Sequence, residues 1–126
     1  MRAHLAAGLL GVLQAGAALA CGHCVEDKIA AVYNHARVID AQARKQQVAF
    51  LAIEGPLVIN EQSRRALVEL LRTQEGVVPG SVQVSLELAS LSFVFDPGRT
   101  RFDALFKSIN KKMQRTGLRV VEMKLL

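Results

Sequence analysis

The chain has 126 residues, of which 51% are hydrophobic and 21% charged, and its formal net charge is +5. This length suits a single domain, and a second independent domain is not expected. The basic residues lie at separate places without interleaved aromatic side chains, which argues against nucleic-acid binding. Because no Ser-His-Asp arrangement or glycine-rich phosphate loop stands out, we expect no enzymatic activity.

Residues 1–20 resemble a secretory signal peptide. A short basic start with Arg2 precedes an apolar run from Leu5 to Leu13, and small residues around position 20 offer a cleavage site before Cys21. The run is too short to cross a bilayer, and no other segment approaches the roughly 20 apolar residues of a membrane helix. We therefore expect an exported, periplasmic protein whose mature chain has no transmembrane segment.

The same junction also resembles a bacterial lipoprotein box, since Ala18-Leu19-Ala20 precedes Cys21. In such proteins the cysteine directly after the cut carries lipid. Its sulfur would then be a thioether, and it could neither form a disulfide nor act as a thiolate. A lipid anchor at Cys21 is therefore an alternative fate of the exported chain.

Residues 25–46 are predicted to form one amphipathic helix. Apolar side chains recur three or four positions apart along one face, and charged side chains take the other. The apolar positions are Val25, Ile29, Val32, Ala36, Ile39 and Ala43. This stripe must be buried, either against a sheet or against a partner.

A strand and a second helix follow. The apolar run over 47–53 predicts the strand, and Gly55 with Pro56 ends it in a loop. Asn60 is placed to cap the helix, and Gly76 is its expected stop. The apolar face of this helix is formed by Leu67, Leu70 and Leu71.

The rest of the chain predicts a hairpin, a helix and a last strand. Apolar and polar residues alternate over 82–88 and again over 91–95, which indicates two half-buried strands. Thr100 and Asp103 resemble a capping box, and Gly117 ends the helix that follows. A final alternation over 121–125 predicts the last strand. The helix carries the apolar stripe Phe102, Leu105, Phe106, Ile109 and Met113.

From residue 47 onward the order is strand, helix, strand, strand, helix, strand. This is the ferredoxin-like βαββαβ arrangement, an antiparallel sheet with its helices on one face. We predict an α+β fold of this type with an additional N-terminal helix. The chain then divides into a signal peptide over 1–20, a CGHC segment with its helix over 21–46, and the ferredoxin-like domain over 47–126.

Several residues of this domain match a known family. They are Glu54-Gly55, Gly76-Val77, Val82-Gln83-Val84-Ser85-Leu86, Phe93-Val94-Phe95-Asp96-Pro97, Phe102, Ile109 and Gly117-Leu118. The pattern resembles the heavy-metal-associated domain of copper chaperones, mercury-binding periplasmic proteins and metal-pumping ATPases. That family binds metal through a CxxC in the loop after the first strand. Here that loop, from Pro56 to Ser63, holds no cysteine, so no ligand carries over.

The only two cysteines, Cys21 and Cys24, instead form a Cys-Gly-His-Cys motif at the mature N-terminus. At the start of a helix, backbone N–H groups and the helix dipole stabilise a thiolate. Two thiolates suit a soft ion such as Cu(I) or Hg(II), whereas a closed zinc site requires four ligands. His23 is either a third ligand or a solvent-exposed spacer. The hypothesis is a metal site formed by Cys21, His23 and Cys24.

Helix geometry bears on this hypothesis. A continuous 22-residue helix would be about 33 Å long, so an antiparallel course along the first strand would bring the motif to the end of the domain where the family's metal loop lies. His35 would lie about 16 Å from Cys24 along the same helix and could not share its ion unless the helix breaks. We predict that His35 is a surface or core residue.

Two other interpretations of the motif stay open. The same four letters occur in protein disulfide isomerases, and a CxxC in an oxidising compartment readily forms a disulfide. A thioredoxin-like enzyme has a strand before its CxxC helix and a cis-proline facing the sulfurs, and Pro56, Pro79 and Pro97 do not fit that pattern clearly. An inert disulfide that fastens the start of the helix is the second alternative.

The sequence therefore predicts an extracytoplasmic protein that binds or delivers a soft, Cu(I)-type metal ion. Its expected partners are the ion and a metal transporter or another periplasmic protein. The first alternative function is a non-catalytic adaptor with a degenerate metal domain. A thiol-disulfide redox protein is the second alternative, which we favour less.

Overall fold

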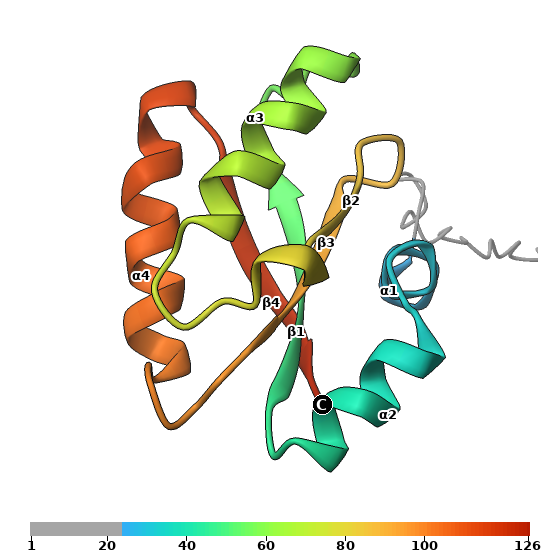
Figure 1. The fold of residues 1–126 in the computed structure, drawn as a ribbon. Helices are drawn as coiled ribbons and strands as arrows, with labels where there is room; N and C mark the ends of the chain where they lie inside the picture. Colours follow the sequence, from blue (N-terminus) through green and yellow to red (C-terminus); the bar gives the residue numbers. More distant parts are fainter. Residues whose placement is uncertain (1–23) are drawn as a thin grey trace, which may run out of the picture.

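A computed structural model describes residues 24–126. Six elements form the predicted βαββαβ unit: β1 (Gln47–Glu54), α3 (Glu61–Arg72), β2 (Gln83–Ser85), β3 (Ser90–Phe95), α4 (Phe102–Met113) and β4 (Arg119–Leu125). The strands make one antiparallel sheet in the order β2-β3-β1-β4. Helices α3 and α4 cover one face of this sheet (Figure 1). The prediction of an α+β, ferredoxin-like fold is confirmed.

The main hydrophobic core lies between the sheet and these two helices. The central strands β1 and β3 supply alternate side chains to it, and α3 and α4 close it from above, which is the arrangement that the apolar stripes predict. Its fully buried members include Leu51, Leu71, Leu91, Phe93, Phe95 and Ile109.

Helix α3 begins where the sequence predicts. The Asn60 Oδ1 atom accepts a hydrogen bond from the Ser63 N–H at 2.8 Å, which satisfies one of the first backbone donors of the helix. The cap fixes the direction in which the chain leaves the loop after β1.

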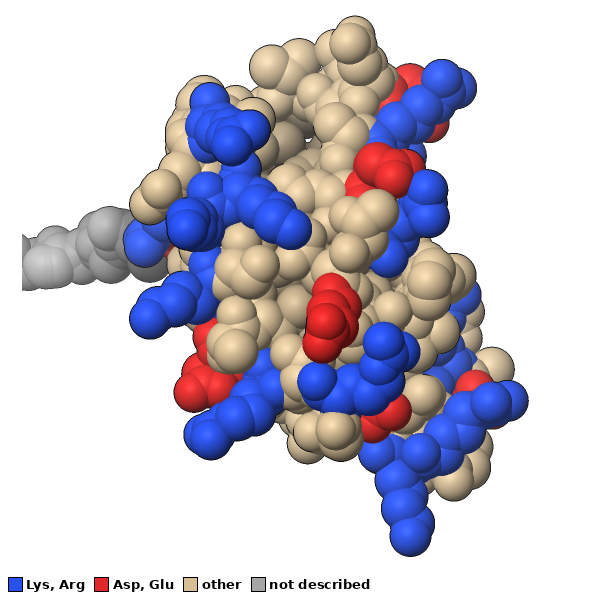
Figure 2. All heavy atoms as spheres, turned by 60° about the vertical axis from the view of Figure 1, so that its left-hand side comes forward, with Lys and Arg blue, Asp and Glu red and all other residues tan. Residues whose placement is uncertain are grey.

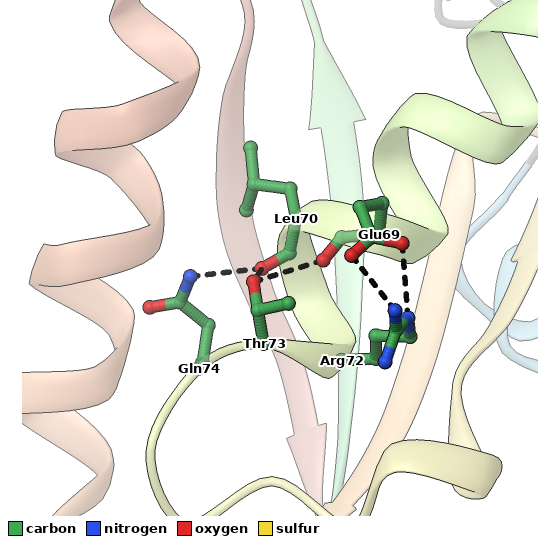
Figure 3. Close-up of polar contacts among 5 residues, drawn as sticks. All are labelled: Glu69, Leu70, Arg72, Thr73 and Gln74. Atoms are coloured by element: carbon green, nitrogen blue, oxygen red, sulfur yellow. Dashed lines mark hydrogen bonds and ion pairs between the residues drawn. The ribbon is translucent and has the colours of Figure 1, made fainter.

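The same helix ends earlier than predicted, at Arg72 rather than near Gly76. Side chains provide the reason, because they satisfy the last carbonyl groups (Figure 3). Thr73 Oγ1 donates to Glu69 O at 2.9 Å, and Gln74 Nε2 donates to Leu70 O at 2.8 Å. The glycine, with φ of 90°, makes the later turn toward the sheet.

The predicted capping box at the start of α4 is wrong. The N-cap residue is Arg101 and no side chain caps the helix, while Asp103 Oδ1 accepts from the neighbouring Ala104 N–H at 3.0 Å and forms an ion pair with Arg101. Thr100 is used for packing instead: a Cβ atom on Gly76 would lie 2.3 Å from its Cγ2 atom. The predicted stop at Gly117 is confirmed, since this residue adopts φ of 77° directly after the short helix η3 (Gln114–Thr116).

The hairpin differs from the prediction in two ways. Strand β2 has only three residues, because the chain leaves the sheet at a turn over 86–89, where Ala89 has φ of 52° and Leu86 is buried. A short helix, η2 (Pro79–Ser81), precedes it. Strand β3 is buried on both faces rather than half-buried. A second layer of helices accounts for this burial.

This second layer corrects the prediction of one helix over 25–46. The segment forms two helices, α1 (Val25–Ala31) and α2 (His35–Ala43). Asn34 adopts an extended backbone, and its side chain accepts from the Arg37 N–H at 3.0 Å, so it caps a new helix instead of continuing the first one. The buried Val32 lies at the break.

Helices α1 and α2 cover the face of the sheet opposite α3 and α4 (Figure 1). A second core joins them to β1 and β3; its buried members are Val32, Val38, Ala41, Val48, Phe50 and Val94. A hydrogen bond of 2.7 Å from Ser92 Oγ to Val32 O ties the junction of the two helices to β3. The apolar stripe of the N-terminal segment is therefore buried against the sheet.

Candidate functional site

Cys24 is the first described residue of the predicted metal motif. The predicted signal peptide, the lipoprotein box, Cys21 and His23 lie outside the described residues. Cys24 is the N-cap residue of α1, and its carbonyl oxygen accepts from the Lys28 N–H at 3.1 Å, the first bond of the helix. Its side chain makes no capping hydrogen bond and is exposed. The thiol is therefore accessible from solvent.

The first turn of α1 carries two carboxylates, Glu26 and Asp27, both exposed. Negatively charged carboxylates attract a cation to the start of this helix. Within residues 24–126 no group of three or more His, Cys, Asp or Glu side chains is arranged to hold a metal ion.

The broken N-terminal segment changes the predicted placement of the motif. Helix α1 has seven residues and contacts β3 and β1, so it extends only about 10 Å before the chain turns. The expectation of a 33 Å helix leading back along the first strand is therefore wrong. Cys24 is instead attached to the layer that covers the second face of the sheet.

His35 is exposed at the start of α2, in agreement with a surface histidine. Its Nδ1 atom lies 3.1 Å from the hydroxyl of Tyr33, whose ring stacks on Phe50 at a centroid distance of 6.1 Å. Because the helix breaks between Cys24 and His35, the estimate of 16 Å between them no longer applies. The imidazole of His35 nonetheless lies within hydrogen-bonding distance of the Tyr33 hydroxyl.

The loop after β1 has a different character from the metal loop of the family that the sequence resembles. Its residues Val58 and Ile59 expose 60% and 59% of their surface. The start of the loop packs against the turn between η3 and β4, since a Cβ atom on Gly55 would lie 2.5 Å from the carbonyl oxygen of Gly117. This exposed apolar tip was not predicted, although the apolar run directly after the strand-ending Gly-Pro pair indicates it.

An apolar cavity of about 270 Å³ adjoins this loop. It lies between α3, from Ser63 to Leu70, and the C-terminal end of α4. Its lining includes Leu57, Val58, Leu67, Leu70, Met113 and Leu118. The loop tip, the cavity and the end of α4 thus form one continuous end of the domain.

The helices within residues 24–126 are all too short or too polar to cross a membrane.

Comparisons with known proteins give a fold-level likeness. No family model matches the chain, and no curated protein matches it. Among solved structures, the chain is similar to the crystal structure of oxidized MerP from Ralstonia metallidurans CH34, with 19% sequence identity and a TM-score of 0.49. The alignment covers 63% of this chain and 99% of that one.

Proposed function

We propose that the chain binds a soft metal ion, Cu(I) in the first instance, through the thiolates of Cys21 and Cys24, with His23 as a third ligand. The observation that carries this proposal is the accessible thiol of Cys24, which no capping hydrogen bond uses, beside the acidic first turn of α1. Thiolate ligands select soft ions over Mg²⁺ or Ca²⁺.

An ion at this position would be cargo rather than a structural element. Cys24 lies at the surface, and two cores independent of any metal hold the described fold together. A solvent-facing two-thiolate site allows ligand exchange with another protein, because an incoming thiolate can reach the ion without unfolding the domain. This supports delivery, with a metal transporter or another periplasmic protein as the receiving partner.

The location rests on the first twenty residues, which resemble a signal peptide. In an oxidising compartment the two thiols would form a disulfide unless an ion or a reductant keeps them apart. The proposed binding form is therefore the reduced protein.

The test is an anaerobic Cu(I) titration of the reduced, exported protein against a competing chelator, after its thiols have been counted. We expect one tight equivalent that is lost in the Cys21→Ser/Cys24→Ser variant. His23→Ala should weaken binding, whereas His35→Ala is the matched control, since this imidazole contacts Tyr33. Equal stoichiometry in the double-serine variant would refute the proposal.

Intact mass after export separates metal binding from lipid anchoring. A mass that includes acyl chains would show that the Cys21 sulfur is a thioether, so that this residue could not supply a thiolate. The unmodified mass of the processed chain with two alkylatable thiols is the result that metal binding requires.

A second candidate is a non-catalytic adaptor, and one observation favours it. The loop that holds the CxxC in the resembling family here presents the exposed side chains Val58 and Ile59. Exposed apolar side chains of this kind typically mark a contact surface rather than a metal ligand set. Under this alternative the double-serine variant keeps all partner binding, and substitutions at the loop tip abolish it.

A further inference from the structure

The excess of positive over negative charge in the chain falls in one segment. Residues 99–119 hold seven Lys and Arg against one acidic residue, whereas residues 24–98 hold seven basic against nine acidic residues. The segment comprises α4, its flanking turns and the first residue of β4. Figure 2, in which α4 comes forward, shows Lys and Arg side chains gathered around this face. The excess charge of the protein therefore lies on one side of the fold.

Several of these cations have no acidic partner. Arg101 pairs with Asp103 and Arg119 with Glu54. Within the described residues, no carboxylate lies within ion-pair distance of Lys111, Lys112 or Arg115. These three side chains line one surface hollow at the C-terminal end of α4.

The same end of α4 adjoins the exposed apolar tip. Met113 and Thr116 share the lining of the apolar cavity with Val58. Val58, one of the two adjacent exposed aliphatic residues, thus shares a cavity with the end of the helical segment that also carries the unpaired cations. Figure 2 shows the upper end of the molecule as a tan surface with Lys and Arg side chains to its left and a mixture of basic and acidic side chains to its right.

We propose that this end of the molecule, formed by the loop over 56–60, the last turn of α4 and η3, binds an anionic phospholipid surface. Val58 and Ile59 would enter the interfacial region, and Lys111, Lys112 and Arg115 would contact the headgroup phosphates. Apolar side chains beside cations are the combination that peripheral membrane binding uses.

A lipid surface fits these residues better than other anionic partners do. A single-stranded nucleic acid would need aromatic side chains on which its bases stack, and the described surface of this end offers aliphatic ones. A nucleic-acid backbone or an acidic peptide would also leave the aliphatic tip in water. An anionic membrane satisfies both the charges and the apolar tip.

The chain has no tryptophan, so one introduced tryptophan reports on one position. We would compare Ile59→Trp with Ile39→Trp, whose isoleucine is similarly exposed but lies on α2 in the other layer. The full chain is mixed with vesicles of phosphatidylglycerol and phosphatidylcholine, or of phosphatidylcholine alone, with brominated acyl chains as quencher. Because bromine quenches only at contact range, the readout reports this surface whether or not residues 1–20 are retained.

We expect a blue shift and quenching for Ile59→Trp with the anionic vesicles, and little response from Ile39→Trp or with phosphatidylcholine alone. Neutralising a cation near an anionic surface weakens binding about fivefold, so Lys111→Gln/Lys112→Gln/Arg115→Gln should weaken it by roughly a hundredfold. The triple variant Lys28→Gln/Arg44→Gln/Lys45→Gln, on the other layer, removes the same amount of charge and should change it much less.

Three results would overturn the proposal. Equal responses of the two tryptophan reporters would show that this surface is not the one in contact. Equal binding by the two charge-neutralised variants would show that the α4 cations are not involved. Tight binding of a duplex or single-stranded oligonucleotide without any vesicle binding would assign the basic face to nucleic acid.

Discussion

Ser92 and Ser90 offer a matched test of how the N-terminal helices are held on the sheet. They lie two residues apart on β3, point to the same face, and are 2% and 0% exposed. Ser92 Oγ donates a hydrogen bond of 2.7 Å to the carbonyl oxygen of Val32, at the junction of α1 and α2. Ser90 Oγ has no hydrogen-bond partner within the described residues. The same Ser→Ala change should therefore have opposite consequences at the two positions.

The expected changes in the free energy of unfolding depend on which buried polar group each substitution leaves unpaired or removes. Ser92→Ala leaves the Val32 carbonyl without this donor and should lower the free energy of unfolding by about 1–3 kcal/mol. Ser90→Ala removes a hydroxyl whose unpaired burial itself costs about 1–3 kcal/mol, so the variant should be as stable as the parent or more stable. For a domain near 100 residues, about 1 kcal/mol corresponds to a Tm change of roughly 4–8 °C.

Urea unfolding monitored by circular dichroism gives the comparison directly. The fluorescence of Tyr33, the single tyrosine, which stacks on Phe50, reports the N-terminal layer separately. We expect Ser92→Ala to lower the midpoint and to affect the tyrosine signal first. An equal loss of stability in the two variants, or no loss in Ser92→Ala, would refute the role assigned to the Ser92 hydrogen bond.

Two further substitutions test the end of the domain that holds the loop after β1. Gly55→Ala should lower the free energy of unfolding by about 2 kcal/mol or more, because φ is 116° and a Cβ atom would meet the Gly117 carbonyl at 2.5 Å. Gly80→Ala is the control, since nothing lies within 4 Å of that Cβ position, and no loss in thermal unfolding is expected. Asn110→Ala should cost about 1 kcal/mol, because the Asn110 amide accepts from the Val120 N–H at 2.7 Å and donates to its carbonyl at 3.3 Å. Faster hydrogen exchange of the Val120 amide would check this, and unchanged protection would contradict it.

The sheet and its first helical layer were predictable because local patterns and the global fold agree. The cap at Asn60, the stripes of α3 and α4 and the alternation in β3 all indicate elements that the structure contains. Element ends were less predictable, because α3 ends through the side chains of Thr73 and Gln74 rather than at a glycine.

Asn34 indicates the break between α1 and α2, but the apolar periodicity of residues 25–46 predicts one continuous helix. Asn34 caps through a side-chain bond to the residue three positions on, as Asn60 does. The apolar stripe continues across the break because both helices face the same sheet, and a continuous stripe therefore suggested one continuous helix.

The candidate site was predictable only in part. The CGHC motif is a local sequence feature, and Cys24 is exposed where the structure describes it. The loop tip and the unpaired cations of α4 come from distant parts of the chain, and only the fold brings Val58 next to Met113. Counting basic residues along the sequence could not show that those of α4 adjoin an apolar surface.

The polar residues inside β3 indicate how the N-terminal segment belongs to the fold. A strand facing water on one side would have no structural need for Ser92 at a particular position, whereas here its hydroxyl meets the carbonyl that ends α1. The second core likewise draws its residues from both sides of position 46, with Val38 and Ala41 against Phe50 and Val94. The boundary between the helical segment and the ferredoxin-like domain therefore divides the sequence but not the packing. A metal ion held at the start of α1 would accordingly be fixed to the folded domain rather than carried on a separate arm.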